Sequence, residues 1–78
     1  MLLEIITPDK KLFDGEVKYA YFPGTDGHFG VLDNHAPMIA TLAAGTVELT
    51  DAGNAKQQFI VKGGVVEISK NKIIVLAE

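Results

Sequence analysis

The chain has 78 residues, 47% of them hydrophobic, and no cysteine, which predicts one folded domain over residues 1–78 and excludes disulfides and Cys-ligated zinc. A domain this small buries only about 60% of its unfolded surface, so its core leaves a thin stability margin. The net charge of −3 and the seven scattered lysines, without any arginine, disfavour nucleic-acid binding and bidentate recognition of phosphate.

The chain opens on a short apolar stretch, residues 2–7, in which Leu3 and Ile5 alternate with Glu4. It has neither a basic leader nor a long apolar run, so we expect no signal peptide and no direct membrane insertion. The same period-two alternation recurs between glycines and prolines that cut the chain into pieces unfavourable for helices. We predict nine short strands, near residues 2–7, 10–13, 16–22, 28–32, 38–43, 45–50, 57–62, 64–69 and 72–77.

Four connections are predicted from local chemistry. Asp14-Gly15 is a hairpin signal. Residues 50–56 contain Asp, Gly and Asn, which supply the left-handed positions that a chain reversal needs. Gly63-Gly64 precedes a β-branched strand and therefore indicates a bulge or a tight corner rather than a phosphate-binding loop. The polar tetrad at residues 69–72 predicts a hairpin turn.

Many short strands at even spacing predict an all-β, antiparallel fold, either a sandwich or a small barrel. A sandwich of two facing sheets suits the mixture of alternating strands with the apolar run "IIVLA" at residues 73–77. We expect that run to be central and covered on both faces.

Residues 24–37 hold both histidines of the chain and are the main candidate for chemistry. His28 and His35 with Asp26 and Asp33 include the ligand types of a catalytic metal, but they lie on a glycine-interrupted strand and the loop after it, which is poor spacing for metal binding. A histidine acting alone as acid or base needs a pocket, which a sandwich of this size seldom encloses. Serine catalysis is close to excluded, because the only serine, Ser69, falls in a predicted turn. We expect no catalytic residue, cofactor or metal.

Both histidines also have non-catalytic interpretations. His35 follows Asn34, which suits a left-handed turn position, and precedes the rigid Pro37, so its ring is placed to bond a backbone carbonyl and shape the loop. A shaped loop equally suits an interface. His28 and Phe29 are neighbours on a predicted strand, so one of them faces outward. Either Phe29 is an exposed aromatic suited to protein contact, or it belongs to the core and His28 is solvated.

Several segments together resemble the epsilon subunit family of F-type ATP synthases, whose mitochondrial counterpart is called delta. The block "PG..G.FGVL..HAP" and the later "F.V.GG..E" are specific as a pair, and the resemblance runs through the whole chain in the order and spacing of the family. The segments are "LFDGEV" at 12–17, "PGTDGHFGVLDNHAP" at 23–37, "GTVEL" at 45–49, "FIVKGGVVE" at 59–67 and "VLAE" at 75–78.

The resemblance implies a flattened β-sandwich of about nine to ten strands. It also implies a non-catalytic rotor subunit of the central stalk, bound to the gamma subunit and to the c-ring of the membrane sector. This subunit would couple the ring to gamma during proton-driven ATP synthesis. The implied location is peripheral, on the cytoplasmic side of a bacterial plasma membrane.

The matched block implies two sets of contact residues. The c-ring set is Asp26, Gly27, His28 and Phe29, and the gamma set is His35, Ala36, Pro37 and Ala40. Two positions depart from the pattern of the family. His28 stands where relatives commonly carry an acid, which alters a charge-based contact to the ring. Asp33 stands where many carry proline, and we expect this to loosen the turn.

Members of the family usually continue past "VLAE" into a hairpin of two helices that carries inhibition and, in some members, a nucleotide site. The sequence has nothing to form that hairpin, so neither regulation nor ATP binding is expected of it. Two other classes of function compete with the rotor. A free-standing ligand-binding β module predicts a row of aromatics, for which Tyr19, Tyr21 and four phenylalanines without a tryptophan are poor support. A metal-dependent hydrolase using His28 and His35 predicts bound metal.

Overall fold

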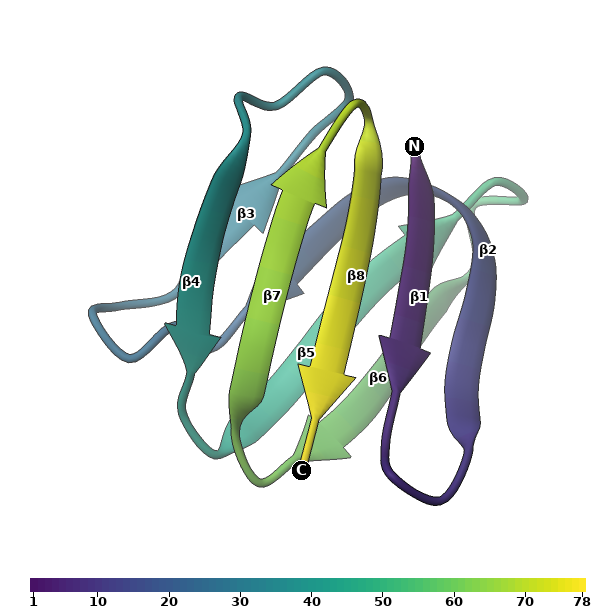
Figure 1. The fold of residues 1–78 in the computed structure, drawn as a ribbon. Helices are drawn as coiled ribbons and strands as arrows, with labels where there is room; N and C mark the ends of the chain where they lie inside the picture. The colour runs from purple at the N-terminus through teal and green to yellow at the C-terminus, as the bar shows by residue number, and fades with distance from the viewer.

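A computed structural model describes all residues, 1–78, as eight β-strands without a helix (Figure 1). None of its elements is therefore an apolar helix of membrane-spanning length. The all-β prediction is confirmed, and eight strands are close to the nine or ten expected. The strands are β1 (Leu2–Ile6), β2 (Lys11–Phe22), β3 (Phe29–Val31), β4 (Met38–Leu42), β5 (Gly45–Asp51), β6 (Lys56–Val61), β7 (Gly64–Ser69) and β8 (Lys72–Ala77).

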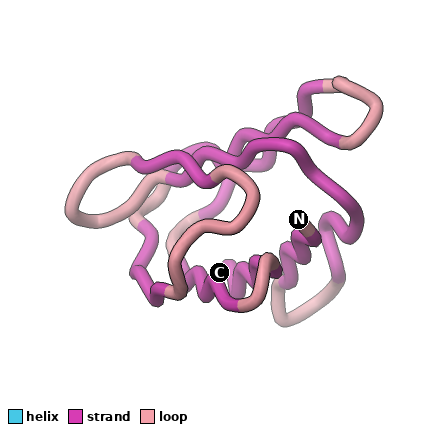
Figure 2. The backbone as a smooth tube through the Cα atoms, turned by 90° about the horizontal axis from the view of Figure 1, so that it is seen from above, coloured by secondary structure: helices cyan, strands magenta, loops and turns pink.

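The strands form two layers that share β2. Hydrogen bonding links seven of them in the order β4-β7-β8-β1-β2-β5-β6, and β3 pairs with β2 from the other side. One layer holds β4, β7, β8, β1 and the first half of β2, and the other holds β3, the second half of β2, β5 and β6. Figure 2 shows the layers one above the other. The extents of 26 × 24 × 18 Å match a flattened sandwich.

The hairpin predicted at Asp14-Gly15 is wrong, because both residues lie inside the 12-residue strand β2. Residues 11–16 pair with β1, and residues 17–21 pair with β5, with a register shift between Val17 and Tyr19. Gly15 does not adopt a positive φ and lies in the ladder opposite Leu3. The turn preference of Asp14-Gly15 does not decide the structure here, because the first half of β2 pairs with β1 and the second half pairs with β5 in the other layer. The predicted strands 10–13 and 16–22 are thus one strand.

The sheet is not purely antiparallel, because β1 and β8 run parallel, with Leu2 opposite Lys72 and Ile6 opposite Leu76. All the other strand pairs are antiparallel. This pairing brings together the first and last strands of the chain. Parallel neighbours are joined by a long crossover rather than a short turn, so no local sequence signal indicates the pairing.

The core lies between the layers and is made by the inward-facing half of each strand. In β8, Ile73, Val75 and Ala77 are buried, whereas Leu76 is 56% exposed and Ile74 is half-buried. The prediction that residues 73–77 are covered on both faces is therefore wrong: the run is central, but a two-layer sandwich covers only one face of each sheet. The buried apolar residues are Met1, Leu3, Ile5, Val17, Ala20, Phe22, Val31, Leu42, Val47, Leu49, Val61, Val66, Ile68, Ile73, Val75 and Ala77.

The other predicted connections are confirmed. Lys70 and Asn71 have φ values of 52° and 59°, as the two central positions of a type I′ hairpin require, and they join β7 to β8. Asn54, with φ 67°, supplies the left-handed position between β5 and β6. Gly63 and Gly64 both have strongly positive φ, 146° and 145°, and make the corner at which the chain leaves β6 and enters β7 in the other layer.

The β5–β6 turn is held by the carboxylate of Asp51. Its Oδ1 accepts the backbone N–H groups of Gly53 and Ala55, each at 2.9 Å, and its Oδ2 accepts the side-chain amide of Gln57 at 3.1 Å. These bonds favour the charged form, and the bond from Ala55 is the main cause that lowers the pKa of Asp51 below its ordinary value.

Asp51→Asn is expected to destabilise the domain in a pH-dependent way. Because the folded-state pKa is depressed, the charged carboxylate stabilises the fold above the unfolded-state pKa, and this contribution is lost as pH falls through the folded-state value. The difference in free energy of unfolding between wild type and variant should therefore shrink on acidification from pH 7 to pH 2, as measured by urea titration. Asp9→Asn, in the exposed β1–β2 connection, is the control. A difference that does not change with pH would contradict the prediction.

Candidate interaction surface

The loop that enters β3 packs beside β4. Thr25 donates its backbone N–H to the carbonyl of Thr41 at 3.0 Å, and the two hydroxyl groups lie 2.6 Å apart. Gly24 forms an isolated bridge with Leu42, and Ala43 donates to the carbonyl of Pro23 at 2.8 Å. These bonds cover one end of the edge strand β4 and fix the loop that carries the predicted c-ring residues.

Asp26, Gly27 and His28 are exposed in this loop, and Phe29 is half-buried. The loop and β4 together line a groove of about 550 Å³. Ala40, which the resemblance assigns to gamma contact, lines the same groove. The groove is lined by Gly24, Thr25, Asp26, Gly27, His28, Phe29, Met38, Ile39, Ala40 and Thr41.

The structure separates the two roles that the sequence left open for His28 and Phe29. Phe29 packs against the core, with its ring 5.5 Å from that of the buried Phe22. His28 points outward and stacks on Tyr21, with ring centroids 5.5 Å apart and planes at 12°. The second interpretation is therefore confirmed, and the exposed ring at this end of the molecule is the imidazole.

His28 and His35 are not brought together. His28 lies in the loop before β3 and His35 in the loop after it, at opposite ends of that strand (Figure 1). No group of three His, Cys, Asp or Glu side chains lies close enough to hold a metal. The geometry thus supplies no arrangement for the metal-dependent hydrolase.

The loop after β3, residues 32–37, turns through Asn34, whose φ of 62° confirms the predicted left-handed position. The Nδ1 atom of His35 lies 2.7 Å from the carbonyl oxygen of Ala36, so the predicted bond between ring and backbone is present. This hydrogen bond is exposed to solvent and joins two adjacent residues. His35 itself is half-buried, and Ala36 and Pro37 are exposed.

Asp33, which the sequence predicts to loosen this turn, makes a contact that sequence reasoning missed. Its Oδ1 accepts a hydrogen bond from the Met1 ammonium at 2.8 Å, and Glu16 accepts another at 3.1 Å. The bond to Asp33 is the main cause that raises the pKa of the Met1 amino group, against the opposing effect of burial. The carboxylate therefore tethers the loop to the start of β1.

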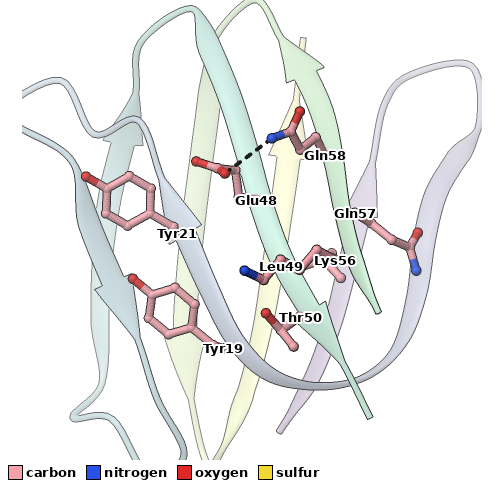
Figure 3. A pocket seen from close by; sticks show the side chains of 8 residues that line it. All are labelled: Tyr19, Tyr21, Glu48, Leu49, Thr50, Lys56, Gln57 and Gln58. Carbon is pink, nitrogen blue, oxygen red and sulfur yellow. Dashed lines mark hydrogen bonds between the residues drawn. The ribbon is translucent and has the colours of Figure 1, made fainter. Parts of the chain in front are cut away.

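A hollow that sequence reasoning missed lies on the outer face of the layer that contains β5 and β6 (Figure 3). Tyr19 and Tyr21 stand on one side of it, since alternate residues of β2 share a face. Glu48 lies opposite Tyr21 in the ladder and accepts a hydrogen bond from the amide of Gln58 at 3.3 Å. The hollow has a volume of about 390 Å³. The signal in the sequence is the i, i+2 spacing of the tyrosines, but their cross-strand neighbours depend on register.

The outer face of the first layer carries exposed apolar side chains. Val65 and Leu76, which are 38% and 56% exposed, are direct neighbours on β7 and β8. Ile39 on β4 is 71% exposed. Neighbouring exposed apolar residues such as Val65 and Leu76 are typical of surfaces that contact other proteins, whereas Ile39 lies opposite Glu67 in the ladder.

Comparison with known proteins decides the family. A family model described as the ATP synthase delta/epsilon chain β-sandwich domain matches residues 1–78. The chain belongs to this family. The resemblance seen in the sequence is thus confirmed over its whole length.

Curated relatives of this delta/epsilon domain are bacterial proteins named ATP synthase epsilon chain. The relative from Maridesulfovibrio salexigens is 41% identical over 78 residues, which are all of this chain and 54% of the relative. The relative from Chlorobium limicola is 42% identical over 76 residues, which are 97% of this chain and 86% of the relative. The chain therefore spans about half the length of the first relative and most of the second.

Two solved structures have the same fold as this delta/epsilon domain. One comes from the Euglena gracilis mitochondrial ATP synthase, OSCP/F1/c-ring in rotational state 1, with a TM-score of 0.92 at 23% identity, covering 99% of this chain and 49% of the other. The second comes from the central stalk/c-ring of the Tetrahymena thermophila mitochondrial ATP synthase, with a TM-score of 0.79 at 18% identity, covering 99% and 62%. At 23% and 18% sequence identity, these two structures show that the fold is shared and nothing more.

Proposed function

We propose that this delta/epsilon domain is a non-catalytic subunit of the central stalk of an F-type ATP synthase, and that it couples the c-ring to the gamma subunit during proton-driven ATP synthesis. The observation that carries the proposal is the family match over all 78 residues, together with relatives named epsilon chain at 41–42% identity. The proposed location is peripheral, on the cytoplasmic side of the energy-converting membrane.

The arrangement of the two loops supports contact with two partners. The loop carrying Asp26 and His28 and the loop carrying His35 lie at opposite ends of β3. The first is fixed to β4 by backbone hydrogen bonds, and the second is fixed by a bond to the side chain of Asn71 and by a bond from the Met1 ammonium. We propose that Asp26 to Phe29 face the c-ring and that residues 35–37 face gamma. Ala40 lines the same groove as Asp26 to Phe29, although the resemblance assigns it to gamma. A stable interface of standard size buries about 1,600 Å² in total, and the exposed apolar residues beside this groove offer area for it.

Coupling of this kind requires stiffness rather than chemistry. Neither histidine ring makes a hydrogen bond to a hydroxyl or carboxylate group: His28 stacks on the ring of Tyr21, and His35 bonds a backbone carbonyl. This supports a subunit that works through its shape.

The tyrosine hollow favours a second candidate function, a ligand-binding β module. Its two aromatic rings next to a carboxylate and the side-chain amide of Gln58 are the residue types of a small polar-ligand site. Saturable binding of a small polar ligand, lost in Tyr21→Ala, would support this candidate over the stalk subunit.

His35→Ala is expected to weaken binding to purified gamma about fivefold, since loss of a contact of about 1 kcal/mol corresponds to that factor. The bond that the ring makes is exposed, so melting should change little. Isothermal titration with gamma measures the affinity, and circular dichroism measures the melting. Asp9→Ala, at the far end of β1, is the matched control. Wild-type protein that fails to bind gamma at micromolar concentration would overturn the proposed function.

A further inference from the structure

Three segments far apart in the sequence meet at one end of the molecule: the start of β1, the loop of residues 32–37 and the β7–β8 turn (Figure 1). Asn71, in the turn, bonds both of the others. Its side-chain Oδ1 accepts the backbone N–H of Asn34 at 2.8 Å, and its backbone carbonyl accepts the N–H of Leu2 at 3.2 Å.

The backbone of Asn71 explains why this side chain suits the position. With φ at 59°, it occupies the left-handed region, which asparagine and glycine tolerate far better than other residues. Glycine would satisfy the turn equally well, but it has no side chain to reach the loop. The Oδ1 contact is therefore separable from the requirements of the turn itself.

The bond reaches the loop at its turning point. Asn34 is itself left-handed, at φ 62°, and it directly precedes His35, so fixing its N–H fixes the direction in which the next three residues leave the turn. The only other side-chain bond from the rest of the chain to this loop is that between the Met1 ammonium and Asp33. Asn71 is the tether that comes from the β7–β8 turn.

We propose that Asn71 is a positioning residue for the gamma contact: it holds residues 35–37 in their binding conformation by accepting the Asn34 N–H. This inference rests on the proposed function, which assigns those residues to gamma. Asn71 touches no partner in the proposal and acts only through the loop.

The test compares three variants of the full 78-residue chain. Asn71→Gly keeps the left-handed turn and removes the acceptor, and Asn71→Asp keeps an acceptor oxygen. Lys70→Gly is the matched control, because Lys70 occupies the neighbouring left-handed position and makes no hydrogen bond to the loop. Amide hydrogen exchange of Asn34, followed by NMR, reports the tether, and isothermal titration with purified gamma reports its consequence.

We expect Asn71→Gly to speed exchange of the Asn34 amide about tenfold and to weaken gamma binding by about the same factor, in line with the loss of one hydrogen bond. Asn71→Asp should restore both, and Lys70→Gly should leave both near wild type. Unchanged exchange in Asn71→Gly, or faster exchange with unchanged gamma affinity, would overturn the inference. If the wild type itself binds no gamma, the proposed function fails and the gamma role of Asn71 fails with it, whereas the exchange data still establish or refute the tether.

Discussion

Phe22→Ala is expected to lower the free energy of unfolding by about 3–5 kcal/mol, the range for removing a buried phenylalanine ring. Phe22 is completely buried at the end of β2 and packs on Phe29. A domain of this length is stable by about 4–12 kcal/mol in total, so the substitution should remove a large share of its stability. Urea unfolding followed by circular dichroism measures the loss.

Ile60→Ala provides the control for this prediction. Ile60 is also an apolar strand residue, but it is 84% exposed, so its truncation should change the free energy of unfolding by no more than about 0.5 kcal/mol. If the two variants lose similar stability, the core does not lie between the layers as described.

Gly64→Ala is expected to cost about 3 kcal/mol or more, although it adds a single methyl group. At φ 145° a Cβ is strained, and it would overlap the carbonyl oxygen of Leu76 and approach the Cα of Ala77 to 3.0 Å. Both obstacles are backbone atoms of the neighbouring strand β8, which cannot move away without breaking the β7–β8 ladder. Thermal and urea unfolding should show the loss as a lower midpoint.

Gly53→Ala makes the same chemical change where there is room for it. Its nearest neighbour is Asp51 Oδ1 at 3.5 Å and its φ is not in the left-handed range, so we expect a change within about 0.5 kcal/mol. Equal stability of Gly64→Ala and Gly53→Ala would show that the β6–β7 corner adjusts without cost.

Features governed by neighbouring residues could be predicted from the sequence. The alternation of Leu3, Glu4 and Ile5 gives the buried face of β1, and the polar residues at 69–72 predict the β7–β8 turn. The residue type of Asn34 predicts a left-handed backbone, and its φ is 62°. In each case the backbone preference of a few residues agrees with the position that the fold requires.

Features governed by distant partners could not be predicted. Asp14-Gly15 has the composition of a hairpin, yet β1 and β5 extend the chain through it. The parallel pairing of β1 with β8 has no local signal. A turn preference of roughly 1 kcal/mol is small compared with the burial of two strand faces, so tertiary pairing decides.

In the candidate surface, too, features set by neighbouring residues could be predicted and features set by distant partners could not. The sequence located His35 in a shaped loop and predicted its bond to a backbone carbonyl, because these depend on adjacent residues. It did not reveal that Ala40 lies beside Phe29, or that Asp33 and Asn71 tether the loop, because each contact joins different elements of the fold rather than adjacent residues.

The parallel ladder between β1 and β8 has a consequence for synthesis on the ribosome. Residues 2–6 emerge first, but their partner on one side, residues 72–76, emerges only when almost the whole sandwich has been made. Until then β1 presents an unpaired edge with apolar side chains, the kind of surface that invites aggregation or chaperone binding. Folding of this domain should therefore be completed late, after residue 76 has left the exit tunnel, rather than strand by strand during translation.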